Sequence, residues 1–363
     1  MDLFAQENTL YVLILFLIAV ILSILINGLF VKFSHTLGMK NQAGGNGDIV
    51  RWASTSKPAF GGISFFILFL FSYAVYALMP TKELLINKVH LAVLLGSTIG
   101  FLIGLADDAY NTKPLLKFSG QLLCAIIFLG AGIVIDISPF RIFNYLFTIF
   151  WVVGIMNSVN MLDNMDGVVS SISVVIIGII LAVSGLNGHF DPFFIITGGG
   201  VIAALIGFLF FNWHPSKIYM GDTGSQFLGA FLSAISIVFI WNFRDAEGPF
   251  IQIKQFIAPL LIFMIPLIDT ITVSIRRMLR GHSPFVGGKD HITHHLAMLG
   301  LKDNFVCITY LLLALIGGCL YLFLFYNNLP AKYMNPIGIG FFFSLFIIIQ
   351  LMYQKNAHQH KIK

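Results

Sequence analysis

The sequence predicts an all-α, polytopic membrane protein with about eleven transmembrane helices. Of the 363 residues, 58% are hydrophobic and only 10% are charged, and the mean hydropathy is +0.90. Such a chain has too little polar surface to cover a soluble domain. Apolar runs long enough to cross roughly 30 Å of hydrocarbon also recur along it. The expected spans are residues 10–31, 59–79, 89–106, 118–135, 142–161, 168–186, 193–211, 225–241, 255–276, 305–326 and 335–353.

The first expected span sets the orientation of the bundle. Its leader carries acids and no Lys or Arg, whereas Lys32 and Lys40 follow the span. Because basic residues concentrate in cytoplasmic loops, we expect the amino terminus outside and, after eleven crossings, the carboxyl terminus in the cytoplasm. This frame puts fifteen of the 21 Lys and Arg residues on the cytoplasmic side. We expect one integral membrane domain over residues 1–363, with a cytoplasmic tail at 354–363.

The third expected span ends in two adjacent carboxylates, Asp107 and Asp108. A charge at the centre of a bilayer helix costs roughly 2.5–3.5 kcal/mol even on permissive scales, so paired acids there need water, a cation or a ligand. Lys113 and Lys117 follow, and both can neutralise phosphate charge. We therefore interpret the acidic pair as functional.

The fifth expected span ends in a run of polar residues, namely Asn157, Asn160, Asp163, Asn164 and Asp166. In a continuous helix, steps of three and four residues place the asparagines on one stripe and the aspartates on an adjoining one. Capping of a helix needs one such residue, not five. The run therefore predicts a polar face at the membrane boundary.

The loop between the seventh and eighth expected spans, which begins at Asn212, offers several recognition groups. Tyr219 supplies a flat aromatic face, and Asp222 supplies an oxygen ligand beside glycines that allow close backbone approach. Capping of the next helix is the alternative role for Asp222. The five aspartates of the three segments would repel one another in a water-poor groove unless a divalent cation neutralised them. Oxygen ligands favour Mg²⁺, or Mn²⁺, over zinc.

The ninth expected span contains Pro259 and Pro266, which should bend the helix. The bend either opens a groove toward lipid or is a packing kink. A basic segment with His291, His294 and His295 follows. We favour anion recognition for these histidines, because no cysteine lies nearby and the segment before them is basic; a solvated loop and a zinc site are the alternatives.

Four motifs occur in order, each at a cytoplasmic span end: Gly-Leu-Ala-Asp-Asp, Asn-x-x-Asn-x-x-Asp-x-x-Asp-Gly, Tyr-Met-Gly-Asp-Thr-Gly-Ser and His-x-x-His-His. Together they closely resemble those of the polyprenyl-phosphate N-acetylhexosamine-1-phosphate transferases, over residues 58–300. The resemblance implies an enzyme of the bacterial inner membrane that depends on Mg²⁺. Its expected reaction transfers a sugar-1-phosphate from a UDP-sugar to undecaprenyl phosphate within the lipid bilayer and releases UMP.

The resemblance also implies roles for individual residues. Asp107 or Asp108 would activate the lipid phosphate, while Asp222 and Asn160 would hold the metal. The substrate contacts that it implies are Lys117, Asn157, Asp163, Asp166, Asn212, Tyr219, His291, His294 and His295, with Lys117 on phosphate, Tyr219 stacked on uracil, Asp166 at the uridine and the histidines at the sugar-phosphate. The chain departs from the family pattern at Asn164, where many members have Gly, and in the spacing of the histidines.

The acidic residue before the histidines, Asp290, is more typical of the N-acetylglucosamine branch than of the muramoyl-pentapeptide branch. We therefore expect UDP-N-acetylglucosamine as donor, with phospho-N-acetylmuramoyl-pentapeptide transfer as the alternative. The product would start a cell-envelope polysaccharide such as teichoic acid or lipopolysaccharide. An ion-coupled transporter, the alternative from another class, would place its carboxylates near the midplane between inverted repeats. No nucleic-acid partner is expected, and the sequence leaves a homodimer open.

Overall fold

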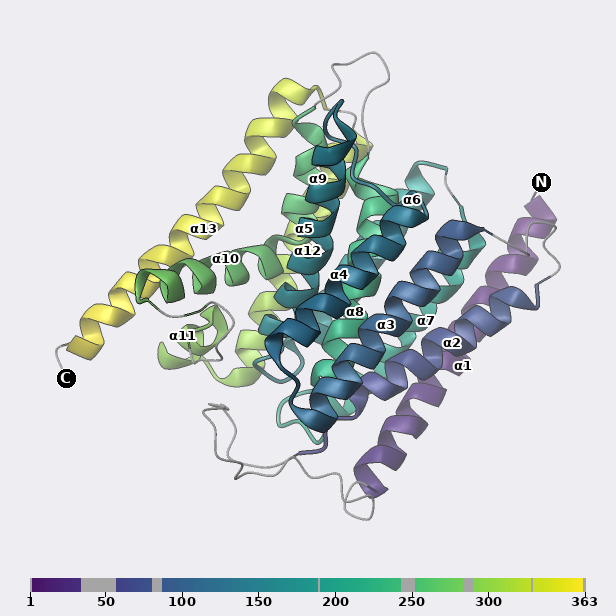
Figure 1. The fold of residues 1–363 in the computed structure, drawn as a ribbon, viewed down its shortest axis with the longest axis horizontal. Helices are drawn as coiled ribbons and strands as arrows, with labels where there is room; N and C mark the ends of the chain where they lie inside the picture. Colours follow the sequence, from purple (N-terminus) through teal and green to yellow (C-terminus); the bar gives the residue numbers. More distant parts are fainter. Residues whose placement is uncertain are drawn as a thin grey trace.

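The computed structural model describes residues 2–33, 57–79, 87–188, 190–242, 252–281, 283, 290–327 and 329–361. Within these ranges every regular element is a helix (Figure 1). The helices are α1 (Asp2–Phe33), α2 (Gly61–Ala77), α3 (Lys88–Tyr110), α4 (Pro114–Gly130), α5 (Arg141–Leu162), α6 (Val168–Leu186), α7 (Pro192–Asn212), α8 (Gly221–Ser236) with the π-helical turn η1 (Ile237–Trp241), α9 (Lys254–Ile262), α10 (Met264–Leu279), α11 (Ile292–Met298), α12 (Asp303–Tyr326) and α13 (Ala331–Lys361).

The prediction of an all-helical polytopic membrane protein is confirmed. Among the described residues, eight helices are long and apolar enough to cross a membrane, or nine if α9 and α10 count as one span. Helices α2 and α4, each of 17 residues, are apolar but shorter. At 1.5 Å per residue they are about 25 Å long, less than the roughly 30 Å of the hydrocarbon core. Every expected span thus contains a helix, although the helix of the fourth ends at Gly130 and not at residue 135, and fewer than eleven have full spanning length.

The ninth expected span is broken at Phe263, where α9 and α10 meet at 82°. Pro259 lies inside α9 and Pro266 lies in the first turn of α10, as the sequence led us to expect. In Figure 1, α10 runs across the bundle toward α13. Ser158 of α5 donates a hydrogen bond to the Pro266 carbonyl (2.8 Å) and lies 2.7 Å from the Thr270 hydroxyl. The bend is therefore anchored to α5.

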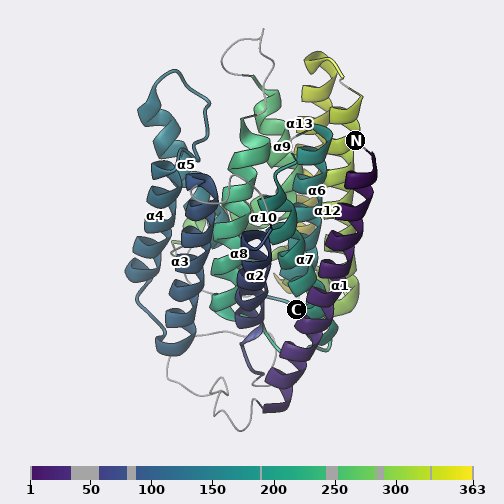
Figure 2. The same cartoon turned by 90° about the vertical axis from the view of Figure 1, so that its right-hand side faces the viewer.

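Helix α8 is the central element, and its residues Thr223–Ser236 are all buried. It packs against α2, α3, α5 and α6, and Figure 2 shows it between its neighbours. Its contact with α3 is very close. A Cβ added at Gly104 would overlap the Asp222 carbonyl, and one at Gly100 would lie 2.7 Å from the Gln226 carbonyl oxygen. Small residues allow such an approach of two membrane helices.

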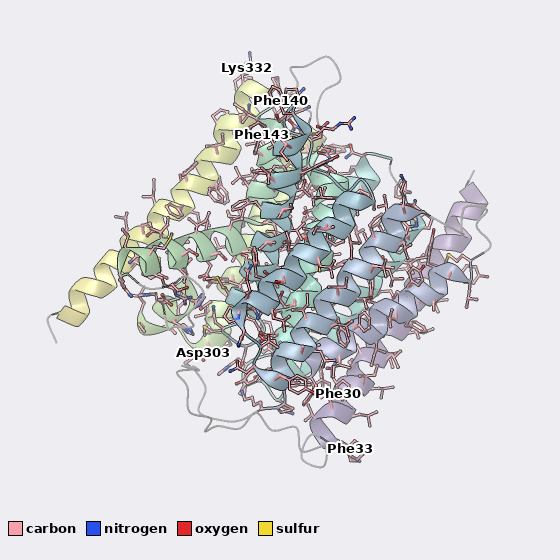
Figure 3. All side chains as sticks on the ribbon, viewed as in Figure 1. Phe30, Phe33, Phe140, Phe143, Asp303 and Lys332 are labelled. Atoms are coloured by element: carbon pink, nitrogen blue, oxygen red, sulfur yellow. The ribbon has the colours of Figure 1, made fainter. Side chains whose placement is uncertain are left out.

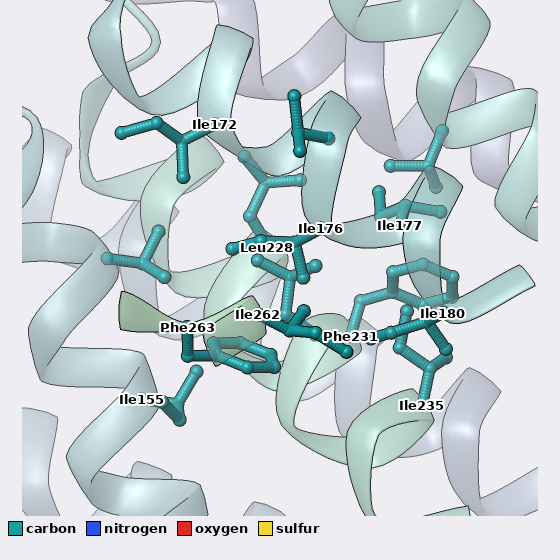
Figure 4. Packing of buried hydrophobic residues seen from close by; sticks show 14 of the residues in the cluster. Ile155, Ile172, Ile176, Ile177, Ile180, Leu228, Phe231, Ile235, Ile262 and Phe263 are labelled. Atoms are coloured by element: carbon teal, nitrogen blue, oxygen red, sulfur yellow. The ribbon is translucent and has the colours of Figure 1, made fainter. Parts of the chain in front are cut away.

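The apolar core is shared by α5, α6, α8 and the bend between α9 and α10 (Figure 4). Ile155, Ile176, Leu228, Phe231 and Phe263 are among its members, and each is at most 1% exposed. Dense packing of this kind resists small displacements. The core therefore provides a rigid support for the ends of α5 and α8.

The two ends of the bundle carry different residues. Figure 3 shows Phe140 and Lys332 at one end and Phe33 and Asp303 at the other. His214, in the loop between α7 and α8, lies 3.8 Å from Asp303. The motifs that the sequence singles out are therefore gathered at the Asp303 end.

Candidate active site

Four side chains from four helices form what we call the cation cluster: Asp107 of α3, Lys117 of α4, Asn160 of α5 and Asp222 of α8. The Lys117 ammonium donates to Asp107 Oδ2 at 3.0 Å, to Asn160 Oδ1 at 3.2 Å and to Asp222 Oδ2 at 2.6 Å. Three motifs that are distant in the sequence thus place their oxygens around one positive charge.

Further hydrogen bonds hold the oxygens of the cation cluster in place. Asn160 donates its amide to Asp222 Oδ1 (2.6 Å) and to the Ser225 hydroxyl (2.9 Å). Asp107 Oδ1 accepts from the backbone and the hydroxyl of Thr112, at 2.9 and 2.6 Å. Because each oxygen has a fixed partner, the cluster is ordered before any substrate binds.

The donor set of the cation cluster suits Mg²⁺. Asp107, Asp222 and Asn160 offer only oxygen, and Mg²⁺ typically binds one or two carboxylates and completes its shell with water and phosphate oxygens. In the described part of the chain, no group of three or more His, Cys, Asp or Glu side chains forms a metal cage. In this structure the positive charge between these oxygens is the Lys117 ammonium.

Asp108 has a different environment from its neighbour Asp107. Its Oδ1 accepts from the backbone N–H of Asp222 (2.9 Å), and its Oδ2 accepts from the backbone N–H (2.9 Å) and hydroxyl (2.6 Å) of Thr223. These groups belong to the first turn of α8, where a carboxylate satisfies open N–H groups and interacts favourably with the helix dipole. Gly221, at φ +72°, leaves room for the carboxylate. Asp108 therefore caps α8 from α3 and holds Asp222 in place.

One turn deeper than the cation cluster, three amide side chains form a second polar layer. Asn157 donates to Gln121 Oε1 (2.9 Å), and Gln121 donates to Gln226 Oε1 (3.0 Å). Because Gln121 and Gln226 are each four residues after a member of the cation cluster, the two layers lie on the same helix faces. Asn157, which the resemblance places at the substrate, is engaged with its neighbours in this amide layer.

Asp163 begins the turn between α5 and α6, which we call the acidic turn (residues 163–167). Burial raises the pKa of Asp163 to about 8, and the nearby carboxylates of Asp222, Asp108 and Asp166 add to the effect. A group of acids this close favours the neutral form of one of them until positive charge arrives. The acidic turn therefore belongs to the same electrostatic site as the cation cluster.

Asp166 and Asn212 fasten the acidic turn to the loop before α8. Asp166 accepts from the backbone and hydroxyl of Ser216, at 3.0 and 2.7 Å, and lies 3.1 Å from Nδ1 of His214. Asn212 accepts from the backbone N–H of Gly167 (2.9 Å) and donates to a loop carbonyl (2.8 Å). Both residues lie at the site, and both hold the loop that carries Tyr219.

Lys57, which was not among the site residues selected from the sequence, lies beside this loop. Its ammonium is 5.1 Å from the centre of the Tyr219 ring, 2.9 Å from the Ser216 hydroxyl and 3.9 Å from Asp166. The backbone N–H of Tyr219 donates to the Pro58 carbonyl at 2.8 Å. The available signal is the Lys-Pro pair just before the glycines that open α2.

The histidines lie on or next to α11. His291 and His294 are 5% and 3% exposed, and the His295 ring lies 3.8 Å from the ring of Tyr353 in α13. Burial, together with the neighbouring His291, lowers the pKa of His294 to about 4, so this side chain is neutral at physiological pH. Thr293 donates to Asn164 Oδ1 at 2.6 Å, which joins the histidine segment to the acidic turn.

Two acidic residues hold the histidine segment. Asp290 accepts from Arg277 Nε and Nη2, at 2.9 and 2.7 Å, and although burial opposes it, this guanidinium keeps the pKa of Asp290 below its ordinary value. Asp269 of α10, which sequence reasoning did not select, lies 2.8 Å from His291 Nδ1. A lone acid within an apolar span near Pro266 was the only sequence signal.

The site therefore combines a cluster of oxygens around the Lys117 ammonium, an aromatic and basic loop, and a histidine segment in which His291 and His294 are buried. All of the residues selected from the sequence lie in these three parts of the site. Several of them, such as Asn157, Asp166 and Asn212, are hydrogen-bonded to other protein groups. Such an arrangement can neutralise and orient a substrate with several phosphate charges.

Comparison with known proteins adds an independent finding. Residues 90–240, which contain the cation cluster and the acidic turn, match the family described as "Glycosyl transferase family 4". Over 317 residues the chain is 28% identical to the "Probable undecaprenyl-phosphate N-acetylglucosaminyl 1-phosphate transferase" of Bacillus subtilis, with 85% of this chain and 83% of that protein covered.

Two further relatives carry a second name, "Phospho-N-acetylmuramoyl-pentapeptide-transferase". The protein of Geobacillus sp. is 29% identical over 339 residues, with 86% of this chain and 97% of that protein covered. The protein of Streptococcus agalactiae is 33% identical over 247 residues, with 61% and 70% covered. The similarity to both kinds of relative extends well beyond the individual motifs.

Proposed function

Because the chain belongs to glycosyl transferase family 4, a family of polyprenyl-phosphate N-acetylhexosamine-1-phosphate transferases, we propose that it transfers N-acetylglucosamine-1-phosphate from UDP-N-acetylglucosamine to undecaprenyl phosphate. The observation that carries the proposal is the convergence of Asp107, Asn160 and Asp222 oxygens on one cation position. The name of the Bacillus subtilis relative supports this choice of donor and acceptor.

In the proposed reaction, an oxygen of the lipid phosphate attacks the β-phosphorus of the UDP-sugar. A new phosphoanhydride bond forms while the bond from the β-phosphorus to the bridging oxygen breaks, and UMP leaves with that oxygen. One anhydride replaces another, so the enzyme has mainly to neutralise charge and align the reactants. We favour this direct attack over a covalent aspartyl intermediate.

Within this scheme we assign the contact with the lipid phosphate to Asp107. The partners of the two acids support the choice, because Asp108 binds the first turn of α8 with both oxygens, whereas Asp107 Oδ2 faces the Lys117 ammonium of the cation cluster. Asp222 and Asn160 would hold Mg²⁺, or Mn²⁺, which when bound supplies positive charge to the pyrophosphate. Lys117, already among these oxygens, would turn its ammonium to a phosphate oxygen.

We assign the uridine to the loop that carries Tyr219. The ring can stack on uracil, and Lys57 adds a positive charge at 5.1 Å from its centre. Asp166 and Asn212 would shape this subsite through the loop contacts described above. The histidine segment would face the sugar-phosphate, with neutral His294 acting as a hydrogen-bonding group.

We further propose eleven crossings, with the amino terminus outside and the site on the cytoplasmic side of a bacterial inner membrane. The distribution of Lys and Arg supports this orientation. The clustering of all four motifs at one end of the bundle supports a site at one membrane face, where a water-soluble UDP-sugar can meet a lipid acceptor. The product would be the first intermediate of a cell-envelope polysaccharide.

A second candidate, phospho-N-acetylmuramoyl-pentapeptide transfer, is favoured by the names of the Geobacillus and Streptococcus relatives. The two reactions share acceptor, leaving group and phosphate chemistry, and differ only in the donor. One assay therefore separates them.

The test uses the purified full-length protein in detergent with undecaprenyl phosphate and Mg²⁺. UDP-N-acetylglucosamine and UDP-N-acetylmuramoyl-pentapeptide are supplied in parallel, and release of UMP is measured. We expect release with the first donor and its loss in Asp222→Ala. Release with the second donor alone would identify the second candidate, and a protein that is inert with every UDP-sugar would overturn the proposal.

A further inference from the structure

We infer that Asp269 is a positioning residue of the proposed transferase. It fixes His291 and the start of α11, and thereby sets the contact of the histidine segment with the acidic turn. The inference rests on the proposed function for its activity assay, but its structural part can be measured separately.

Asp269 is a carboxylic acid inside an apolar span. Its side chain is fully buried in α10, just after the bend of the broken span. A buried carboxylate is costly unless it is paired and hydrogen-bonded. Asp269 has two such partners, because its Oδ2 lies 2.8 Å from His291 Nδ1 and its Oδ1 accepts from the backbone N–H of Ile292 at 3.0 Å. The residue is therefore fully committed to the first residues of the histidine segment.

The ring of His291 is held between Asp269 and Arg277. We assign the proton of the His291 ring to Nδ1, the nitrogen beside Asp269, because the Arg277 guanidinium on the other side of the ring can only donate. The other ring nitrogen, Nε2, lies 3.5 Å from Arg277 Nη2, and that guanidinium binds both oxygens of Asp290. The result is a row of four groups, Asp269, His291, Arg277 and Asp290. The row fixes both the ring plane and the backbone on each side of it.

Two hydrogen bonds connect this row to the acidic turn. Ile292 is the first residue of α11, so the hydrogen bond from its N–H to Asp269 fixes where the helix starts. The next residue, Thr293, donates to Asn164 Oδ1 at 2.6 Å. Asn164 follows Asp163, which lies in the electrostatic site. Three consecutive residues thus connect a carboxylate of the broken span to the turn beside the cation cluster.

Asp269 acts through other residues, because it is fully buried and His291 is only 5% exposed. A group of this kind orients a functional segment in the same way that outer-shell carboxylates orient metal-binding histidines, where loss of the partner typically costs about 10–100-fold in affinity or activity. Asp269→Asn keeps the volume of the side chain and removes its charge.

The chain contains a matched control. His90 Nε2 lies 2.8 Å from Asp191 Oδ2, the same separation as in the Asp269 pair, and His90 is also buried, although the Asp191 side chain is 33% exposed. This second pair joins the starts of α3 and α7, whereas the site lies at their carboxyl ends. Asp191→Asn should therefore change stability without changing the site.

The experiment compares Asp269→Asn, His291→Gln, their double variant and Asp191→Asn. Steady-state UMP release gives kcat/KM, thermal unfolding gives the melting temperature, and hydrogen–deuterium exchange reports on residues 290–300 and on the acidic turn. We expect Asp269→Asn to lower kcat/KM about tenfold or more. The double variant should be no worse than His291→Gln, because the two residues act as one unit. Exchange should rise in both segments, whereas Asp191→Asn should leave both segments and kcat/KM unchanged.

Two results would overturn the inference. One is unchanged exchange in the acidic turn of Asp269→Asn, and the other is a multiplicative loss of kcat/KM in the double variant. If Asp269→Asn does not fold, His291→Gln provides the same exchange comparison. A wild-type protein that is inert with all donors would contradict the proposed function, while the exchange data would still decide the role of Asp269.

Discussion

Replacing Gly104 by Ala should separate α3 from α8 and disturb the cation cluster. A Cβ at this position would overlap the Asp222 carbonyl and lie 2.6 Å from the Cα of Thr223. Carbon atoms in contact are about 3.5–4.0 Å apart, so the two backbones would have to move apart by about 1 Å. Overpacking of this kind costs about 1–3 kcal/mol.

The same movement shifts Asp222 away from Asp107 and Lys117. A misplacement of about 1 Å can reduce the rate of an enzyme by about 100-fold. We therefore expect Gly104→Ala to lower both the melting temperature in detergent and kcat for UMP release, the second by about 10–100-fold.

Gly154 of α5 provides the control, since an added Cβ there meets no atom within 4 Å. Gly154→Ala should keep full activity and gain up to about 1 kcal/mol from its higher helix propensity. If Gly104→Ala retained wild-type activity and stability, the close approach of α3 and α8 would have no part in holding the site. That result would refute the reasoning.

Three further changes probe the charges of the site. Lys117→Met removes the positive charge between the carboxylates. The melting temperature of this variant in EDTA should therefore be lower than that of the wild type, and added Mg²⁺ should raise it by more than it raises that of the wild type. An equal response of the two proteins to Mg²⁺ would contradict the prediction. Asp163, with its raised pKa of about 8, binds a proton in the folded state that the unfolded chain releases near pH 4. Its contribution to the stability of the folded protein therefore falls as pH rises from about 4 to 8. The melting temperature of Asp163→Asn should increase relative to that of the wild type across this range. A constant difference between the two melting temperatures would contradict this prediction. Asp108→Asn weakens the cap of α8. Because solvent screens the charge of Asp108, we expect the free energy of unfolding to fall by only about 1–2 kcal/mol, together with a loss of UMP release. Unchanged stability would show that the charge of Asp108 does not support the helix.

The fold and the meeting of the main motifs could be predicted from local sequence. Long apolar runs place a helix at each expected span, and Pro259 and Pro266 mark the bend. Acids at the ends of separate spans need a counter-charge wherever they come together, and the resemblance of the four motifs implies that Asp107 and Asp222 share one site. These inferences depend on hydrophobicity and charge, which act over short stretches of chain.

The partner of each side chain could not be predicted in this way. Asp107 and Asp108 are adjacent in sequence, yet one faces Lys117 and the other caps α8, because successive helical residues point about 100° apart and meet different neighbours. Asp269 belongs to no motif, and only the bend of the broken span brings it to His291. Such contacts follow from tertiary packing between different helices, whose contacting residues are 10, 22 and 115 positions apart in these three cases.

The amide layer of Gln121, Asn157 and Gln226 has a consequence for the membrane itself. Amide side chains carry no charge at any physiological pH. The ionisable groups of the cation cluster are therefore followed, one helical turn deeper, by a layer of uncharged polar groups. Along α4, α5 and α8, this layer offers a proton or metal ion no carboxylate or ammonium to carry it inward. Along these three helices, the amide layer therefore separates the charged chemistry of the site from the apolar core beneath it.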